Sequence, residues 1–108
     1  MMVNNIYSGT TGGRSEDETL ELLAGSENVK IKKIISEGHA SPKGFWYDQD
    51  VDEWVVLLTG SAGLAFAGSH DVVALKPGDW INIPAHVRHR VEWTDAAEKT
   101  IWLAVYYR

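Results

Sequence analysis

The chain has 108 residues, 44% of them hydrophobic, which suffices for one domain with a single core and is too short for two. Its net charge of −5, with acidic and basic residues interspersed, offers no basic stripe for a phosphate backbone, so we expect no nucleic-acid partner. The absence of cysteine excludes disulfides and thiolate metal sites, and any metal would have nitrogen and oxygen ligands.

Residues 1–17 are rich in Gly, Ser, Thr and Asn and lack helix or strand periodicity, so we interpret them as an N-terminal arm before a domain over residues 18–108. The arm lacks the apolar stretch of a signal peptide. No later window approaches the length of a membrane span, so we expect a cytoplasmic protein with no membrane partner.

The next segment allows two interpretations. A helix over 16–23 would have acidic residues in its first turn. Alternatively, a strand over 19–24 turns at 25–28 into a second strand that begins at 29. The hairpin is favoured because residues 29–32 alternate between apolar and charged, and Gly-Ser-Glu-Asn is typical of turns.

From residue 54 onward, short apolar and β-branched runs recur about every ten residues and are separated by Gly, Pro and Asp turns. This spacing is typical of a β-sandwich or a closed barrel, and no helix of ordinary length fits after residue 41. The predicted strands cover residues 54–58, 64–67, 72–75, 80–83, 89–93 and 100–107.

Two ionisable residues interrupt otherwise apolar faces of these strands. Glu53 shares a face with Val55 and directly precedes an apolar run, and His89 shares a face with Val91 and Trp93. Because a barrel can direct a few polar side chains inward among apolar neighbours, both residues are predicted to line a central pocket.

The segment Gly78–His89 resembles the second sequence motif of the cupin superfamily: a Gly, five residues, a Pro, one residue, usually a Gly, two residues and a His. Here His86 stands at the usual second Gly. Glu53 and Gly60 have the spacing of the Glu and Gly in the first cupin motif. The resemblance covers about residues 44–108 and implies a small single-domain cupin, an all-β antiparallel double-stranded β-helix or jelly-roll barrel.

Both histidines of the first cupin motif are missing. A four-residue gap before the motif Glu aligns them with Trp46 and Asp48, and a three-residue gap aligns them with Tyr47 and Gln49. An inward Trp46 or Tyr47 would replace an imidazole by a flat ring and would favour an aromatic or apolar ligand.

The resemblance implies a divalent metal, such as iron, nickel, zinc or manganese, in the central pocket. Carried over by position, two family ligands remain, and the others must come from neighbouring oxygen or nitrogen donors. The candidate ligands are Glu53, His89, Asp48, Gln49 and His86.

Strands 54–58 and 101–107 are apolar on both faces, whereas a single barrel needs only one apolar face. The outer face is therefore predicted to be covered by the N-terminal hairpin or by a second subunit. A homodimer is expected, and the resemblance points the same way because small cupins commonly pair.

Three functions follow from these features. The first is a metal-dependent enzyme for a small molecule, such as an oxygenase or isomerase. The second is a non-catalytic small-molecule binding or sensing barrel without metal. The third is metal-free acid–base isomerisation or epimerisation by His89 or His86 with a carboxylate.

Overall fold

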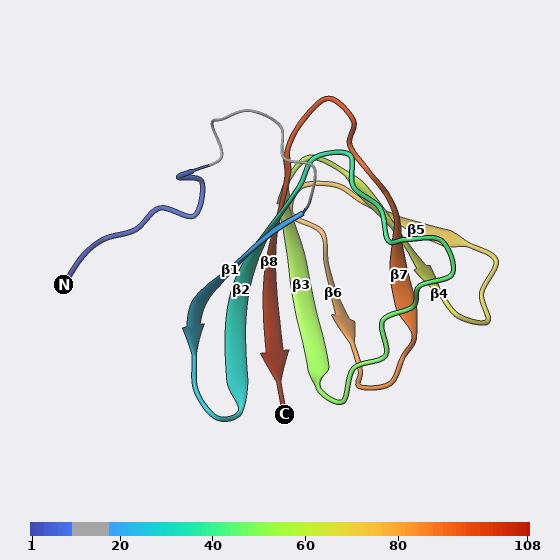
Figure 1. Ribbon diagram of the computed structural model, residues 1–108, viewed down its shortest axis with the longest axis horizontal. Helices are drawn as coiled ribbons and strands as arrows, with labels where there is room; N and C mark the ends of the chain where they lie inside the picture. Colours follow the sequence, from blue (N-terminus) through green and yellow to red (C-terminus); the bar gives the residue numbers. More distant parts are fainter. Residues whose placement is uncertain (10–17) are drawn as a thin grey trace.

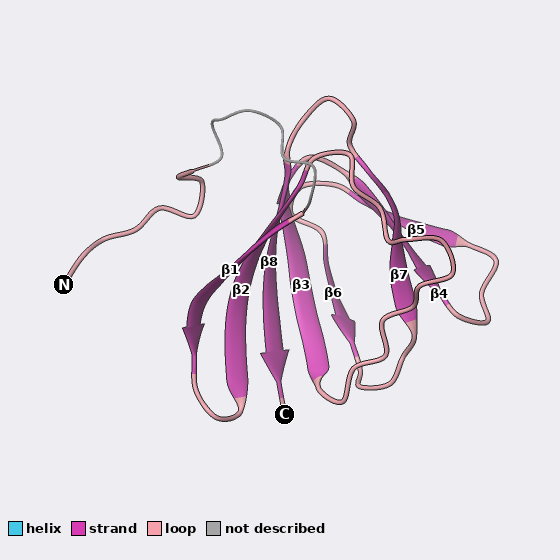
Figure 2. Cartoon of the chain, in the orientation of Figure 1, coloured by secondary structure: helices cyan, strands magenta, loops and turns pink. Residues whose placement is uncertain are grey.

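The computed structural model describes residues 1–9 and 18–108, and these ranges contain eight strands and no helix (Figures 1 and 2). The predicted all-β class is confirmed, with all pairings between these strands antiparallel. No membrane-spanning helix is found in the described part of the chain. The strands are β1 (Thr19–Gly25), β2 (Val29–Ser36), β3 (Asp52–Thr59), β4 (Ala62–Phe66), β5 (Val72–Leu75), β6 (Trp80–Ile83), β7 (His89–Thr94) and β8 (Thr100–Tyr107).

The strands form two sheets that pack against each other through their apolar faces (Figure 1). The larger sheet has the order β1-β2-β8-β3-β6, and the smaller has the order β5-β4-β7. Because consecutive strands often belong to different sheets, residues distant in the sequence face one another across the interior. The core between the sheets contains Val55, Leu57, Ala62, Leu64, Leu75, Ile83, Trp102 and Ala104.

The predicted N-terminal hairpin is confirmed as β1 and β2, which pair antiparallel with a bulge between Leu22 and Ala24. The helical alternative for residues 16–23 is wrong from residue 19 onward, and its first two residues lie outside the described ranges. The hairpin extends the larger sheet at β8 and does not cover its outer face. Residues 10–17 of the predicted arm also lie outside the described ranges.

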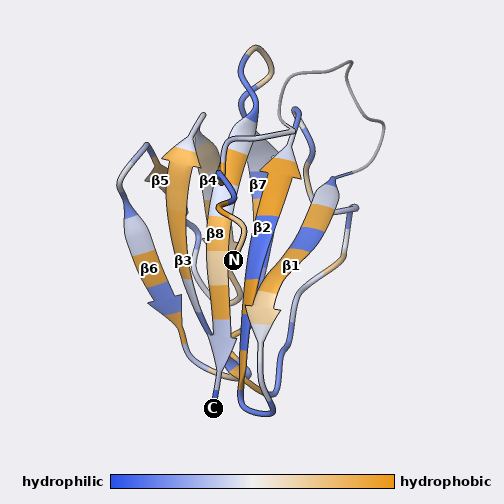
Figure 3. Cartoon of the chain, turned by 90° about the vertical axis from the view of Figure 1, so that its left-hand side faces the viewer, coloured by the Kyte–Doolittle hydropathy of each residue, from blue (hydrophilic) through white to orange (hydrophobic). Residues whose placement is uncertain are grey.

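The start of the chain covers part of the outer face of the larger sheet. The N-terminal segment passes over β8 and β2 in Figure 3, and the ammonium of Lys33 donates a hydrogen bond to the carbonyl oxygen of Ser8 at 2.8 Å. Toward β6 the outer face stays open: Trp80 is 62% exposed, and its ring centroid lies 5.8 Å from that of Trp54. The second subunit predicted for this face remains a prediction.

If a second copy covers this face, replacing Trp80 by Arg should convert a dimer into a monomer, because a charge would be buried at the contact. Analytical ultracentrifugation would measure the masses. Trp93 is 42% exposed on the smaller sheet, so Trp93→Arg is the matched control and should leave a dimer intact. A monomeric native chain would contradict the prediction.

Candidate functional site

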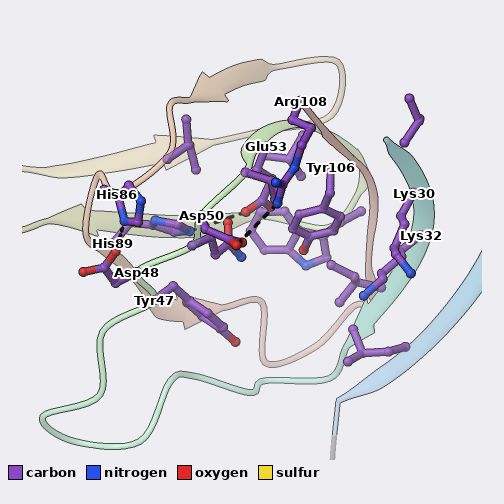
Figure 4. Close-up of a pocket in the computed structure, with 18 of the residues that line it drawn as sticks. Lys30, Lys32, Tyr47, Asp48, Asp50, Glu53, His86, His89, Tyr106 and Arg108 are labelled. Atoms are coloured by element: carbon purple, nitrogen blue, oxygen red, sulfur yellow. Dashed lines mark hydrogen bonds and ion pairs between the residues drawn. The ribbon is translucent and has the colours of Figure 1, made fainter. Parts of the chain in front are cut away.

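Glu53 and His89 reach the same point from opposite sheets. Glu53 is the second residue of β3, where it pairs with Tyr106 on one side and Ile83 on the other. His89 begins β7 in the smaller sheet. Its Nε2 lies 3.5 Å from Glu53 Oε1. The side chain of His89 is only 6% exposed and that of Glu53 only 9%. The two residues therefore form a buried acid–base pair (Figure 4).

Both ring nitrogens of His89 face oxygen acceptors. Nδ1 lies 2.8 Å from the carbonyl oxygen of Val87, which can only accept, so Nδ1 is the donor. Nε2 faces the Glu53 carboxylate. Burial lowers the pKa of His89, but the hydrogen bond to Glu53, the Val87 carbonyl and the Glu53 charge together outweigh it, and the pKa is raised above 6.5.

This raised pKa makes a pH-dependent contribution to stability. A histidine whose folded pKa exceeds its unfolded value stabilises the fold fully below the unfolded pKa, here 6.5, and the contribution disappears as the pH rises through the folded pKa. The difference in free energy of unfolding between the native chain and His89→Gln should therefore be larger at mildly acidic than at alkaline pH. Urea denaturation at a series of pH values measures it.

The control for this measurement is His70→Gln, which removes an exposed imidazole from the turn between β4 and β5. Its effect on the free energy of unfolding should be small, because the side chain is exposed. A difference for His89→Gln that stays constant with pH would contradict a protonated pair.

Aromatic rings hold the His89 imidazole in place. Tyr47 stacks on it with a centroid distance of 5.4 Å and an interplanar angle of 25°, and Phe66 lies at 6.2 Å. The backbones of Tyr47 and His89 exchange two hydrogen bonds of 2.7 and 3.1 Å. The ring therefore has little freedom to turn away from Glu53.

Two tyrosine hydroxyls belong to the same pocket. Burial, followed by the charges of Glu18 and Glu53, raises the pKa of Tyr47. For Tyr106, burial, the Glu53 charge, Tyr47 and Glu18 raise the pKa strongly against a hydrogen bond with Gln49 that lowers it. Both phenols therefore stay neutral around pH 7 and can donate hydrogen bonds to a ligand oxygen.

His86 and Asp48 form a second pair, which is exposed. His86 Nδ1 lies 2.8 Å from Asp48 Oδ1, with side chains 69% and 50% exposed. In the described ranges His86 is the one non-glycine residue with a positive φ, 65°, at the position where the cupin motif usually has Gly. Its backbone N–H donates to the carbonyl of Gln49 at 2.7 Å, which holds the turn in place.

These groups surround a pocket of about 800 Å³ between the two sheets. All five predicted metal ligands and three of the predicted pocket residues line it. Sequence reasoning did not identify the wall formed by β1, β2 and β8, because strand pairing between distant segments brings it there. The predicted residues that line the pocket are Glu53, His89, Asp48, Gln49, His86, Tyr47, Val55 and Val91, and the unpredicted ones include Glu18, Leu20, Lys30, Lys32, Trp102, Tyr106 and Arg108.

Two residues predicted for the pocket do not line it. A bulge in β7 places Val91 opposite Leu64 but Trp93 opposite the adjacent Gly63, which breaks the alternation of faces, and Trp93 is 42% exposed. Trp46 does not line the pocket, and the Arg88 guanidinium lies 5.7 Å from the centroid of its ring.

The donors do not fit the metal centre that the resemblance implies. In the part of the chain that the structure describes, no three His, Asp or Glu side chains converge on one point. Glu53 with His89 and Asp48 with His86 remain two separate pairs. Of the two alignments of the missing histidines, Tyr47 with Gln49 places both residues on the pocket wall, and a phenol and an amide are weaker ligands than two imidazoles.

Three solved structures illustrate what the chain resembles. A presumed mannose-6-phosphate isomerase from Ralstonia eutropha JMP134 is 44% identical, with 99% of this chain and 98% of the other covered and a TM-score of 0.93. A cupin superfamily protein from Desulfitobacterium hafniense DCB-2 is 21% identical over 89% and 82% of the two chains, with a TM-score of 0.72. An RmlC-like cupin with a double-stranded β-helix fold from Methanocaldococcus jannaschii is 17% identical over 86% and 82%, with a TM-score of 0.69.

The two structures below 25% identity bear on the fold alone, and they agree with the predicted double-stranded β-helix. No protein-family model matches the chain, and no curated protein does.

Proposed function

The chain belongs to the cupin superfamily, and from this premise we propose that its pocket isomerises a small sugar by proton transfer between Glu53, His89 and the substrate, without a metal. The observation that carries the proposal is the buried pair itself: a carboxylate and an imidazole 3.5 Å apart, facing a cavity large enough for a sugar. Function is argued from this site because the fold alone does not specify one.

The two groups have complementary roles in moving a carbonyl between adjacent carbons. The Glu53 carboxylate removes the proton from the carbon next to the carbonyl, and the C–H electron pair forms the carbon–carbon double bond of an enediol. The His89 imidazolium protonates the carbonyl oxygen at the same time. Return of the proton from Glu53 to the former carbonyl carbon, and loss of the neighbouring O–H proton to His89, completes the isomerisation and restores both groups.

The surrounding side chains favour this chemistry. The raised pKa of His89 keeps an imidazolium available as donor, and the low exposure of the pair strengthens its electrostatic effect on a developing enediol. The neutral hydroxyls of Tyr47 and Tyr106 can orient the sugar oxygens. Gln49 adds an amide to the same wall.

The comparison at 44% identity supports the class of substrate. The protein from Ralstonia eutropha is named for an isomerase of mannose 6-phosphate, and the match extends over nearly all of both chains. We therefore take mannose 6-phosphate as the first substrate to test.

The experiment is an isomerisation assay with mannose 6-phosphate in D2O, followed by proton NMR. Conversion to the ketose with loss of the signal of the proton on carbon 2 is the expected result, and it should persist after treatment with a chelator. Elemental analysis should find well below one metal ion per chain, because the donor set lacks a third His, Asp or Glu.

Two outcomes would contradict the proposal. Turnover that disappears with the chelator and returns with a divalent ion would favour the metal-dependent enzyme. Binding of sugars with neither conversion nor deuterium exchange would favour a non-catalytic binding barrel.

A further inference from the structure

We infer that Lys30 and Lys32 form a seat for the phosphate of the substrate, and that this seat directs the carbonyl end of the sugar toward Glu53 and His89. The inference rests on the proposed function for the position of the reacting carbons, but the seat itself rests on β2. Both lysines line the pocket, and Figure 4 shows them on the side opposite His86 and His89.

Strand register fixes the place of the lysines relative to the acid–base pair. Lys30 pairs with Tyr106 of β8, and Tyr106 pairs in turn with Glu53 of β3. Residues directly opposite each other on neighbouring strands point to the same face, so these three side chains form one row across the interior. Two strand spacings separate Lys30 from Glu53, or about 10 Å between Cα atoms, so a sugar phosphate that reaches both residues would lie against the Tyr106 side chain between them.

Lys32 lies two residues further along the same face, opposite Ala104. Its ammonium does not stay beside this apolar residue, because Nζ reaches a position 5.1 Å from the Tyr106 ring centroid. A ring face attracts a cation but leaves its hydrogen-bond donors free. The ammonium of Lys32 is therefore directed toward the row that contains Lys30, Tyr106 and Glu53.

Neither lysine has an ion-pair partner in the described ranges, whereas Lys33, Lys99, Arg90 and Arg108 all have one. Glu18, the acid of the pocket nearest to the start of β1, already accepts a hydrogen bond from Ser36 at 2.7 Å. Two ammonium groups on one pocket wall that no ion pair neutralises in the described ranges favour an anionic ligand.

The cations of this wall are compatible with a phosphate group. The single Arg on the described pocket wall, Arg108, contacts Asp50 at 3.4 Å, which leaves the two lysines as the cations without an ion pair. Lysine binds phosphate as a point charge, which suits a group with three equivalent oxygens. Glu27 also lines the pocket near the hairpin turn and opposes this charge, so it supplies an internal test.

The experiment measures binding of mannose 6-phosphate and of mannose by calorimetry in Glu53→Gln, so that no turnover accompanies binding. Adding Lys30→Gln or Lys32→Gln should weaken binding of the phosphate about tenfold or more, leave mannose unchanged and reduce the dependence of affinity on salt. Adding Glu27→Gln should strengthen binding of the phosphate. Lys43→Gln, in the exposed loop before β3, is the control and should change neither affinity.

In the chain with Glu53 intact, the lysine variants should raise KM for mannose 6-phosphate about tenfold or more and should also lower kcat, because the carbonyl end is then less well positioned. If the lysine variants bind mannose 6-phosphate as tightly as the chain with both lysines, the phosphate seat is overturned, whereas the proposed isomerase is not affected. Lysine-dependent binding in a chain that never isomerises the sugar would overturn the isomerase and retain the seat. Thermal melting of each variant identifies any loss of affinity that comes from unfolding.

Discussion

Replacing Glu53 by Gln is expected to lower kcat for isomerisation of mannose 6-phosphate by about 10²- to 10⁴-fold, the range that a positioned acid or base contributes. Glutamine has nearly the same shape and can still contact His89 Nε2, but its amide does not accept a proton from carbon. Since the pocket keeps its shape, KM should change little. The kinetic constants come from the NMR assay at several substrate concentrations.

His89→Gln should reduce kcat by a comparable factor, and the double variant should lose little more than either single one, because the two groups act as a unit. In the native chain kcat should fall as the pH rises through the raised pKa of His89, since the imidazolium donor is then lost.

The matched control is Glu92→Gln, which removes the same charge from an exposed position on β7, beside Arg90. It should leave kcat unchanged. Full activity in Glu53→Gln would rule out proton transfer by this carboxylate. Lost activity that added divalent metal restores would show that Glu53 acts as a metal ligand and not as a base.

The sequence was most informative where a local rule determines the structure. The turn of residues 76–79 closes as Pro, Gly and Asp predict: Asp79 N–H donates to the carbonyl of Lys76 at 3.0 Å, and Gly78 has a φ of 94°. The spacing of the motif residues likewise predicted that Glu53 and His89 line one pocket. This succeeds because the number of residues between two motif positions determines where they lie on facing strands.

Two kinds of information were not available from the sequence. Regular alternation over residues 89–93 predicts that Val91 and Trp93 share a face, whereas the bulge in β7 places them on opposite faces. No residue type in this segment indicates a bulge. The contribution of Lys30 and Tyr106 depends on β2 pairing with β8, which joins residues 64 to 78 positions apart in the sequence. A wall formed by long-range pairing cannot be assigned from periodicity within either strand.

Gly60 joins β3, the strand of Glu53, to β4, and Gly60→Ala is expected to lower the free energy of unfolding by about 2 to 5 kcal/mol. Its φ is +81°, a region that costs an L-residue side chain energy, and an added Cβ would lie 2.7 Å from the Cα of Thr100. Thr100 has no exposed surface, and its hydroxyl donates to the Ser61 carbonyl at 3.2 Å. Thr100 therefore cannot move away from the added Cβ, so the cost of the positive φ and the cost of the close contact both apply.

Gly68→Ala separates the two costs. Gly68 has a φ of +86°, but a Cβ there would meet no atom within 4 Å, so only the backbone term of about 1 to 2 kcal/mol should appear. Urea denaturation of both variants gives the comparison. Equal losses would show that crowding against Thr100 contributes nothing. A larger loss at Gly60 would explain physically why a glycine closes the first motif: the turn that ends the Glu53 strand runs directly against the backbone of β8.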